Sequence, residues 1–127
     1  MHIRNIHSSQ VFDSRGVPTL QTRVTLENGA TGIREIVISL GGDGALFISG
    51  DGVYRASALK VEVKSTVGAG DAMVAAMVFG HAGKLPREEK LRLAVAMGAA
   101  SVMQSGSQPP EADLVWELAK QVKLEKL

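Results

Sequence analysis

The sequence has no cysteine, few aromatic residues and no excess of either charge. Without cysteine the chain has no disulfide bonds and no cysteine-ligated metal, and this composition fits a cytoplasmic protein. Aromatic residues make up only 4% of the chain, so its core must be built from aliphatic side chains and methionine. Fourteen Lys and Arg against thirteen Asp and Glu give a net charge of +1, which offers a nucleic acid no basic surface.

Long hydrophobic runs are also missing. The apolar run at residues 72–79 is far too short to span a bilayer, and residues 1–7 lack the hydrophobic core of a signal peptide. No cluster of Lys and Arg points to a membrane surface. We therefore expect a soluble, cytoplasmic protein that binds neither nucleic acid nor membrane, with its 127 residues in a single domain (1–127).

The first half of the chain alternates between strand patterns and turn residues. Six segments have the composition of strands: 2–12, 18–27, 36–40, 45–49, 53–56 and 59–64. The glycines of residues 50–52 predict a hairpin. The segment 36–40 is apolar throughout, which is typical of a strand covered on both faces. The segment 59–64 alternates strictly, with Val63 among the residues expected to face inward.

The second half carries helix patterns. The first expected helix, 71–82, is apolar all round and should be buried. The second begins at Pro86, a favoured first helical position, and ends near 105–107. The third opens at 109–111 and closes among the lysines at 120, 123 and 126. The sequence thus predicts an α/β fold, or the same elements in α+β packing, with a mainly antiparallel sheet of N-terminal strands followed by three helices.

A glycine-rich turn separates the last predicted strand from the first predicted helix. Glycines 68 and 70 let the backbone take positive φ and let a ligand approach closely. The first amides of a helix have no intrahelical partner and carry partial positive charge, so Gly68, Ala69 and Gly70 predict an anion site. Because Asp71 would repel a phosphate, we interpret it as a base that takes a proton from an attacking hydroxyl. The alternative is a turn that merely starts a buried helix.

This turn lies in a longer stretch with a family resemblance. Residues 65–78, S-T-V-G-A-G-D-A-M-V-A-A-M-V, resemble the C-terminal signature of the phosphofructokinase-B carbohydrate kinases. The similarity extends from about 36 to 122 and looks closest to the 1-phosphofructokinase and tagatose-6-phosphate kinase branch. It implies part of a ribokinase-like fold and ATP with Mg²⁺ as cofactor. It also implies a sugar phosphate as acceptor, Asp71 as catalytic base and residues 68–70 as the anion hole.

The same resemblance implies a nucleotide site. In the family, the loop after the apolar strand helps to hold the nucleotide, and glycines there let amides crowd against phosphates or ribose. The corresponding residues here are Ser39, Gly41, Gly42, Asp43 and Gly44. Taken alone, this G-G-D-G stretch also suits an ordinary turn. Gly98, on the second predicted helix, is a candidate for facing an adenine, although close helix packing explains a small residue there equally well.

No metal site is predicted from the chain's own side chains. The three histidines, His2, His7 and His81, have no metal-ligand spacing, and we expect them at the surface or at element ends. Met73 and Met77 are predicted to fill the core rather than to line a binding groove.

A second resemblance covers the N-terminus. The residues D-S-R-G-V-P-T at 13–19 resemble the D-S-R-G-N-P-T segment of enolases, with Val17 in place of asparagine, and the similarity spans 2–32. None of the enolase catalytic elements is present, so enolase activity is not expected. We interpret the chain as a chimera, with an enolase-like hairpin at 1–33 and a ribokinase-like segment at 34–127.

Three functions are compatible with these patterns. The chain could be a kinase that needs a partner chain or an oligomer, because the family's sugar-binding half and its N-x-x-E motif are not found here. It could be a catalytically silent module that binds a nucleotide or a phosphate. It could also be a fold without ligand, whose exposed apolar surfaces drive homo-oligomerisation.

Overall fold

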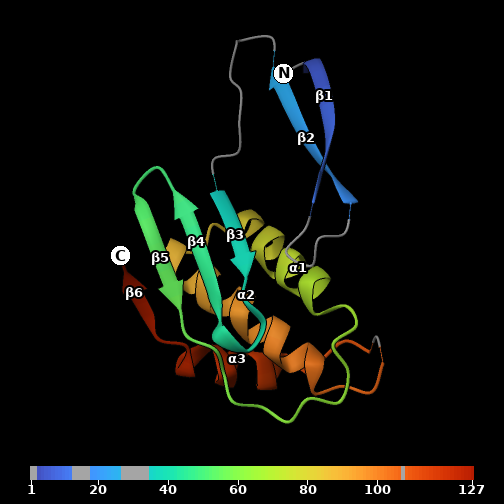
Figure 1. Cartoon of the computed structure of the whole chain (residues 1–127). Coiled ribbons are helices and arrows are strands. Elements are labelled where there is room, and N and C mark those ends of the chain that lie inside the picture. Colours follow the sequence, from blue (N-terminus) through green and yellow to red (C-terminus); the bar gives the residue numbers. More distant parts are fainter. Residues whose placement is uncertain (1–2, 13–17, 27–34, 107) are drawn as a thin grey trace. The chain divides into compact units, whose positions relative to one another are not determined.

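A computed structural model describes residues 3–12, 18–26, 35–106 and 108–127 of the chain (Figure 1). The chain divides into two compact units, Met1–Arg34 and Glu35–Leu127. This boundary lies next to the join between the two resemblances. The prediction of a single domain stays a prediction, and each unit is described by itself.

The N-terminal unit contains two antiparallel strands that form a sheet of their own, β1 (Ile3–Phe12) and β2 (Pro18–Leu26). Ile6 pairs with Val24, and Phe12 pairs with Pro18. Both strands were predicted. Most of the D-S-R-G-V-P-T turn, at 13–17, lies outside the described residues.

Four strands of the second unit form one antiparallel sheet in the order β3-β4-β5-β6. Their bounds are β3 (Glu35–Ser39), β4 (Ala45–Ser49), β5 (Gly52–Ala56) and β6 (Leu124–Lys126), with a 3-10 turn η1 (Gly41–Asp43) after β3. The predicted hairpin at 50–52 is confirmed, since Ser49 pairs with Gly52 across its turn. In this part of the chain β3 and β6 are the edge strands.

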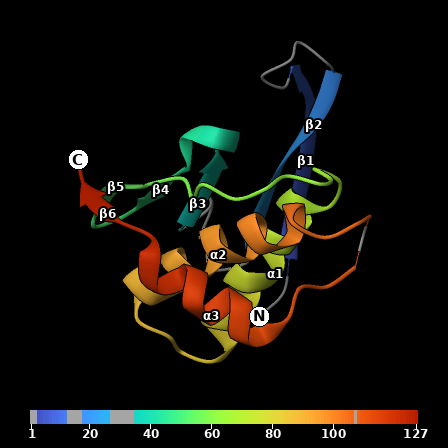
Figure 2. The ribbon, with the colours of Figure 1, turned by 90° about the horizontal axis from the view of Figure 1, so that it is seen from below.

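The helices of this unit cover one side of the four-stranded sheet (Figures 1 and 2). They are α1 (Ala69–Ala82), α2 (Arg87–Val102) and α3 (Ala112–Gln121). One core cluster joins the three helices, and a second joins the sheet to α2 through Phe47, Leu91 and Val95. The α/β class, the antiparallel sheet and the three helices are thus confirmed.

The predicted strand at 59–64 is wrong. Residues 57–66 form no strand, because the position beside β5 is occupied by β6, with Ala56 paired to Leu124. The N–H groups of Lys64 and Ser65 instead donate to the carbonyl oxygen of Val102 at the end of α2, over 2.8 and 3.1 Å. Val63, which was expected to face inward, is exposed.

The end of the third helix also differs from the prediction. The helix stops at Gln121, and Val122 takes an extended conformation and is buried in the core cluster that includes Phe47. The chain then runs back along the sheet as β6, so the lysines at 123 and 126 do not lie on a helix.

Two predictions of complete burial are wrong. In α1 only Ala76 and Gly80 are buried, whereas Val74, Val78 and Phe79 are 64%, 63% and 60% exposed. On β3 the residues of one face are covered less than expected, with Ile36 and Ile38 exposed by 39% and 41%. In both cases the outward side chains meet no covering element among the described residues of this unit.

Candidate functional site

The N-terminus of α1 has the geometry of an open anion site. Gly68 precedes the helix with φ +81°, a left-handed conformation that favours glycine. The N–H of Ala69 reaches the carbonyl oxygen of Thr66 only at 3.4 Å. Within the described chain, the N–H groups of Gly70 and Asp71 donate to no acceptor. The first turn therefore presents free donors at the positive end of the helix dipole.

Asp71 lies in this first turn and is exposed. Its carboxylate is therefore accessible to an incoming hydroxyl group. The predicted base and the predicted anion hole, residues 68–70, are thus placed on one turn of the chain. Their chemical roles stay predictions.

The loop after β3 is closed by its own hydrogen bonds. The N–H of Leu40 donates to the carbonyl oxygen of Gly44 over 2.8 Å, and the N–H of Asp43 donates to that of Leu40 over 3.1 Å. A Cβ on Gly44 would lie 2.0 Å from the carbonyl oxygen of Ala56, so this glycine is required by packing. Gly41 and Gly42 face open space, which leaves room for a ligand.

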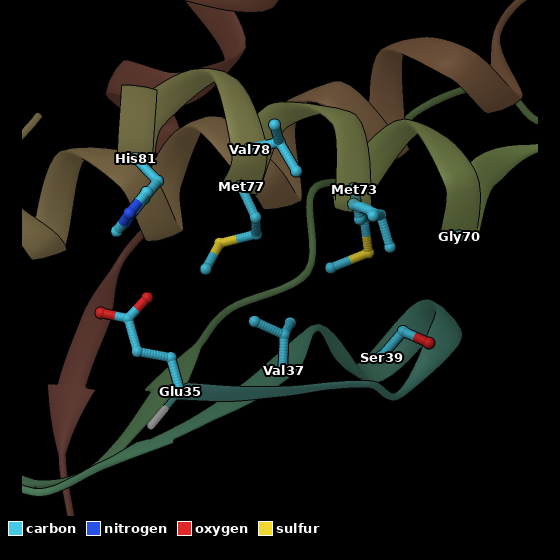
Figure 3. Close-up of a pocket in the computed structure, with 9 residues that line it drawn as sticks. Glu35, Val37, Ser39, Gly70, Met73, Met77, Val78 and His81 are labelled. Carbon is cyan, nitrogen blue, oxygen red and sulfur yellow. The ribbon is translucent and has the colours of Figure 1, made fainter. Parts of the chain in front are cut away.

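A groove of about 570 Å³ runs between β3 and α1 (Figure 3). Ser39 and Gly70 both line it, so the structure brings one predicted nucleotide residue close to the predicted anion hole. Its other lining residues are Glu35, Val37, Met73, Val74, Met77, Val78 and His81. In Figure 3 the side chain of Val37 points from the strand towards those of Met73 and Met77 on the helix.

The remaining nucleotide candidates lie elsewhere. Gly42 and Asp43 line a second hollow of about 450 Å³, which also contains Arg55 and Lys123. Gly98 is buried, and a Cβ there would lie 2.8 Å from Cγ of Met73. Packing between α1 and α2 thus accounts for this glycine, and its contact with an adenine stays a prediction.

Sequence reasoning missed the groove. Met73 and Met77 were assigned to the core, which they do contact, but they also line the groove with His81. The signal was present in the spacing, because the groove residues of α1 at 70, 73, 74, 77, 78 and 81 recur at intervals of three and four. This spacing places them on one face of the helix.

A buried lysine in the first turn of α2 forms an ion pair with Glu35, which lines the groove. The Nζ atom of Lys90 lies 2.6 Å from Oε2 of Glu35, and the lysine side chain is only 6% exposed. The same nitrogen lies 6.0 Å from the ring centre of Phe47. A Cβ at Gly80 of α1 would lie 2.8 Å from Cγ of Lys90. Glu35 thus links the mouth of the groove to α2.

A second ion pair joins the β4–β5 turn to α2. Arg87 contacts the carboxylate of Asp51, whose hydrogen bond raises the pKa of Arg87 above its ordinary value.

Neither a metal cluster nor a membrane helix is found in the described ranges. No three His, Asp or Glu side chains lie close enough together there to hold a metal ion. Of the helices in the same residues, none combines the length and the apolar character that crossing a membrane requires.

Comparison with known proteins assigns the chain to a family. The sequence model described as "pfkB family carbohydrate kinase" matches residues 17–114. The chain belongs to the pfkB family of carbohydrate kinases. The match begins inside the segment with the enolase resemblance, and the enolase-like origin of 2–32 stays a prediction.

Relatives of this pfkB chain are sugar and sugar-phosphate kinases. It is 46% identical to the 1-phosphofructokinase of Escherichia coli K12 over 103 residues, which cover 80% of the chain and 33% of that enzyme. A putative phosphofructokinase from Staphylococcus aureus has a TM-score of 0.70 at 34% identity, over 76% of the chain and 31% of its own length. A ribokinase from Thermotoga maritima has a TM-score of 0.64 at 25% identity, over 70% of the chain and 31% of its own.

These comparisons confirm the predicted family and the ribokinase-like fold of the matched part. The chain spans about a third of the length of the curated relatives it matches. The activity of a whole kinase is therefore treated as a proposal.

Proposed function

We propose that the chain forms the phosphate-binding part of a cytoplasmic, ATP-dependent sugar-phosphate kinase. The observation that carries this proposal is the open first turn of α1, where the free N–H groups of Gly70 and Asp71 adjoin an exposed carboxylate. The 46% identity to a 1-phosphofructokinase supports a sugar phosphate as the acceptor.

In the proposed reaction, a hydroxyl oxygen of the sugar phosphate attacks the γ-phosphorus of ATP. The hydroxyl proton passes to Asp71, the bond from the γ-phosphorus to the bridging oxygen breaks, and ADP leaves. The amides at the start of α1 stabilise the negative charge on the transferring group. Phosphoryl transfer depends mainly on positioning and electrostatics. The amides of this turn therefore supply the chain's main contribution to catalysis in the proposed reaction.

The loop residues Ser39, Gly41 and Gly42 fit a nucleotide, and we expect Mg²⁺ to be held mainly by the phosphates of that nucleotide. Ser39 lines the groove, and the backbone at Gly41 and Gly42, which follow it in the loop, faces open space that leaves room for a nucleotide. When bound, ATP with Mg²⁺ supplies the phosphoryl group and neutralises its charge. Mg²⁺ commonly binds through phosphates and few carboxylates, so it would enter the site with ATP.

A hybrid kinase tests the proposed function. In it, the matched third of the Escherichia coli 1-phosphofructokinase is exchanged for the corresponding residues of this chain. We expect the hybrid kinase to phosphorylate the sugar phosphate of the parent enzyme in a coupled assay. A hybrid that binds ATP and folds like the parent, yet transfers no phosphoryl group, would contradict the proposal.

A glycine substitution tests the anion site in the isolated chain. Gly68→Ala places a side chain at φ +81°, a strain of roughly 1–2 kcal/mol. If the turn relaxes to relieve this strain, the affinity for Mg²⁺-ATP should fall about 5- to 30-fold in a calorimetric titration. Gly106→Ala is the matched control, because Gly106 has φ +77° and also faces open space, but lies after α2. An equal loss of affinity in both variants would count against a site at α1.

A further inference from the structure

A hollow between β5 and the first turns of α2 is not used by the proposed reaction. It measures about 340 Å³ and is lined by Tyr54, Pro86, Arg87, Glu88, Glu89 and Arg92. In this part of α2, Lys90 faces Gly80 near the end of α1, whereas a Cβ on Gly98 would lie 3.6 Å from the carbonyl oxygen of Ala69, at the start of α1. The hollow therefore lies at the opposite end of the helix pair from the open turn at 68–71.

Two arginines of this hollow have hydrogen-bond donors that the described chain does not use. The Nε atoms of Arg87 and Arg92 are buried, and neither donates to an acceptor among the described residues. Arg87 contacts Asp51 through Nη2, and its side chain is 32% exposed, while Arg92 is partly buried. Burial of a charged donor without an acceptor is costly. An acceptor brought into the hollow would let either guanidinium turn its unused N–H groups towards it.

Arg92 does not pair with the acids that its position in the helix offers. Glu88 and Glu89 precede it by four and three residues, spacings that favour ion pairs on a helix. Both glutamates are exposed, yet no ion pair joins either of them to Arg92. The Arg92 guanidinium lines the hollow instead, where it is available to a ligand.

The backbone at the start of α2 adds to the positive character of the arginines. The helix has no side-chain cap, and the N–H of Lys90 is the first that is bonded, to the carbonyl oxygen of Pro86 over 2.9 Å. In the described chain the N–H groups of residues 87–89 donate to no acceptor. These groups lie at the positive end of the helix dipole, next to both guanidinium groups.

We propose that this hollow is a second anion site, in which Arg87 and Arg92 bind the phosphate group of a small molecule. Each guanidinium presents two parallel N–H groups, and one such pair already satisfies the two oxygens of a carboxylate. Two guanidinium groups therefore suit a phosphate, which has more oxygens and a larger charge. This inference does not rest on the proposed function, whose phosphates would bind at the other end of the helix pair.

The size and the acids of the hollow limit its ligand. A volume of about 340 Å³ is at the lower end of the range for small-molecule pockets, which favours a small ligand. Glu88 and Glu89 line the same hollow and would repel an anion, and Asp51 competes for Arg87. We therefore expect binding in the millimolar range, set by the balance between the arginines and these three acids.

A titration followed by nuclear magnetic resonance tests the proposal. The ¹⁵N-labelled full chain is titrated with inorganic phosphate, with glycerol phosphate and, as a carboxylate control, with acetate. We expect both phosphates to cause saturable shifts of the amide signals of residues 87–92, and acetate to bind at least tenfold more weakly. Arg92→Gln should weaken phosphate binding at least tenfold, and Arg92→Lys should restore part of it. Glu89→Gln should strengthen binding at least twofold, because it removes a repelling charge.

The matched control is Arg55→Gln. Arg55 is an exposed arginine on β5 that lines a different hollow, so this variant loses the same charge in the same unit. A folded chain whose amides at 87–92 show no saturable shift would overturn the proposal. Equal weakening by Arg55→Gln, or acetate binding as tight as phosphate binding, would overturn it too. Binding of inorganic phosphate without glycerol phosphate would restrict the hollow to the free ion and likewise contradict the proposal. Shifts at 68–71 report the other anion site separately.

Discussion

Replacing Asp71 by asparagine in the hybrid kinase should lower kcat by about 10²- to 10⁴-fold. Asparagine has nearly the same size and shape as aspartate, but its amide cannot accept the proton of the attacking hydroxyl. Because Asp71 is exposed in the first turn of α1, the substitution leaves no buried group without a partner. The KM for ATP should change little, since in the proposed site the phosphates would meet the backbone N–H groups rather than this side chain.

The control for this prediction is Asp113→Asn. Asp113 is also an exposed aspartate in the first turn of a helix, here α3. Both substitutions remove one negative charge from a helix N-terminus, so their effects on helix stability should be alike. If Asp71→Asn kept full kcat, or if Asp113→Asn lost as much, Asp71 would not be the base.

The second large effect concerns stability. Glu35→Gln should lower the free energy of unfolding by about 3 kcal/mol, because the buried ammonium of Lys90 would lose its counter-charge. The only tryptophan, Trp116, lies in the same unit, so its fluorescence in a urea titration measures the change. A midpoint shift without a change in slope would identify a loss of stability.

Two further variants identify the cause. Glu117→Gln breaks an ion pair of the same length, 2.6 Å between Lys120 and Glu117, but both of its side chains are exposed, so it should cost well under about 1 kcal/mol. Lys90→Met in addition to Glu35→Gln should recover most of the stability, because an apolar side chain needs no counter-charge. A large cost at Glu117, or no recovery in the double variant, would contradict this account of the buried lysine.

The elements that the sequence predicted well depend on local signals. The β4–β5 hairpin follows from the glycines at 50–52, and α2 follows from Pro86 and an apolar face. The open turn of α1 was predicted for the same reason, since Gly68 and Asp71 are close in sequence.

The features that were missed depend on distant contacts. β6 is a three-residue strand, and its position is set by pairing with β5, far earlier in the chain. That pairing also removed the place for the predicted strand at 59–64. The ion pair of Lys90 and Glu35 joins residues 55 positions apart, which no local pattern reports. Complete burial of β3 and α1 was expected from their apolar sequences. An apolar sequence shows that a surface can be buried, but it does not show whether this unit supplies the element that covers it.

The contact between α1 and α2 has a consequence for how the sequence can vary. The two helices run antiparallel and approach closely at both ends, where Gly98 of α2 faces Met73 and Gly80 of α1 faces Lys90. A larger residue at Gly98 could be accommodated by a shorter one at Met73, so these positions should covary among homologues. A larger residue at Gly80 has no such freedom, because Lys90 is also held by Glu35. Among the contacts between the two helices, sequence variation should therefore concentrate at Gly98 and Met73, at the end that carries the proposed anion site.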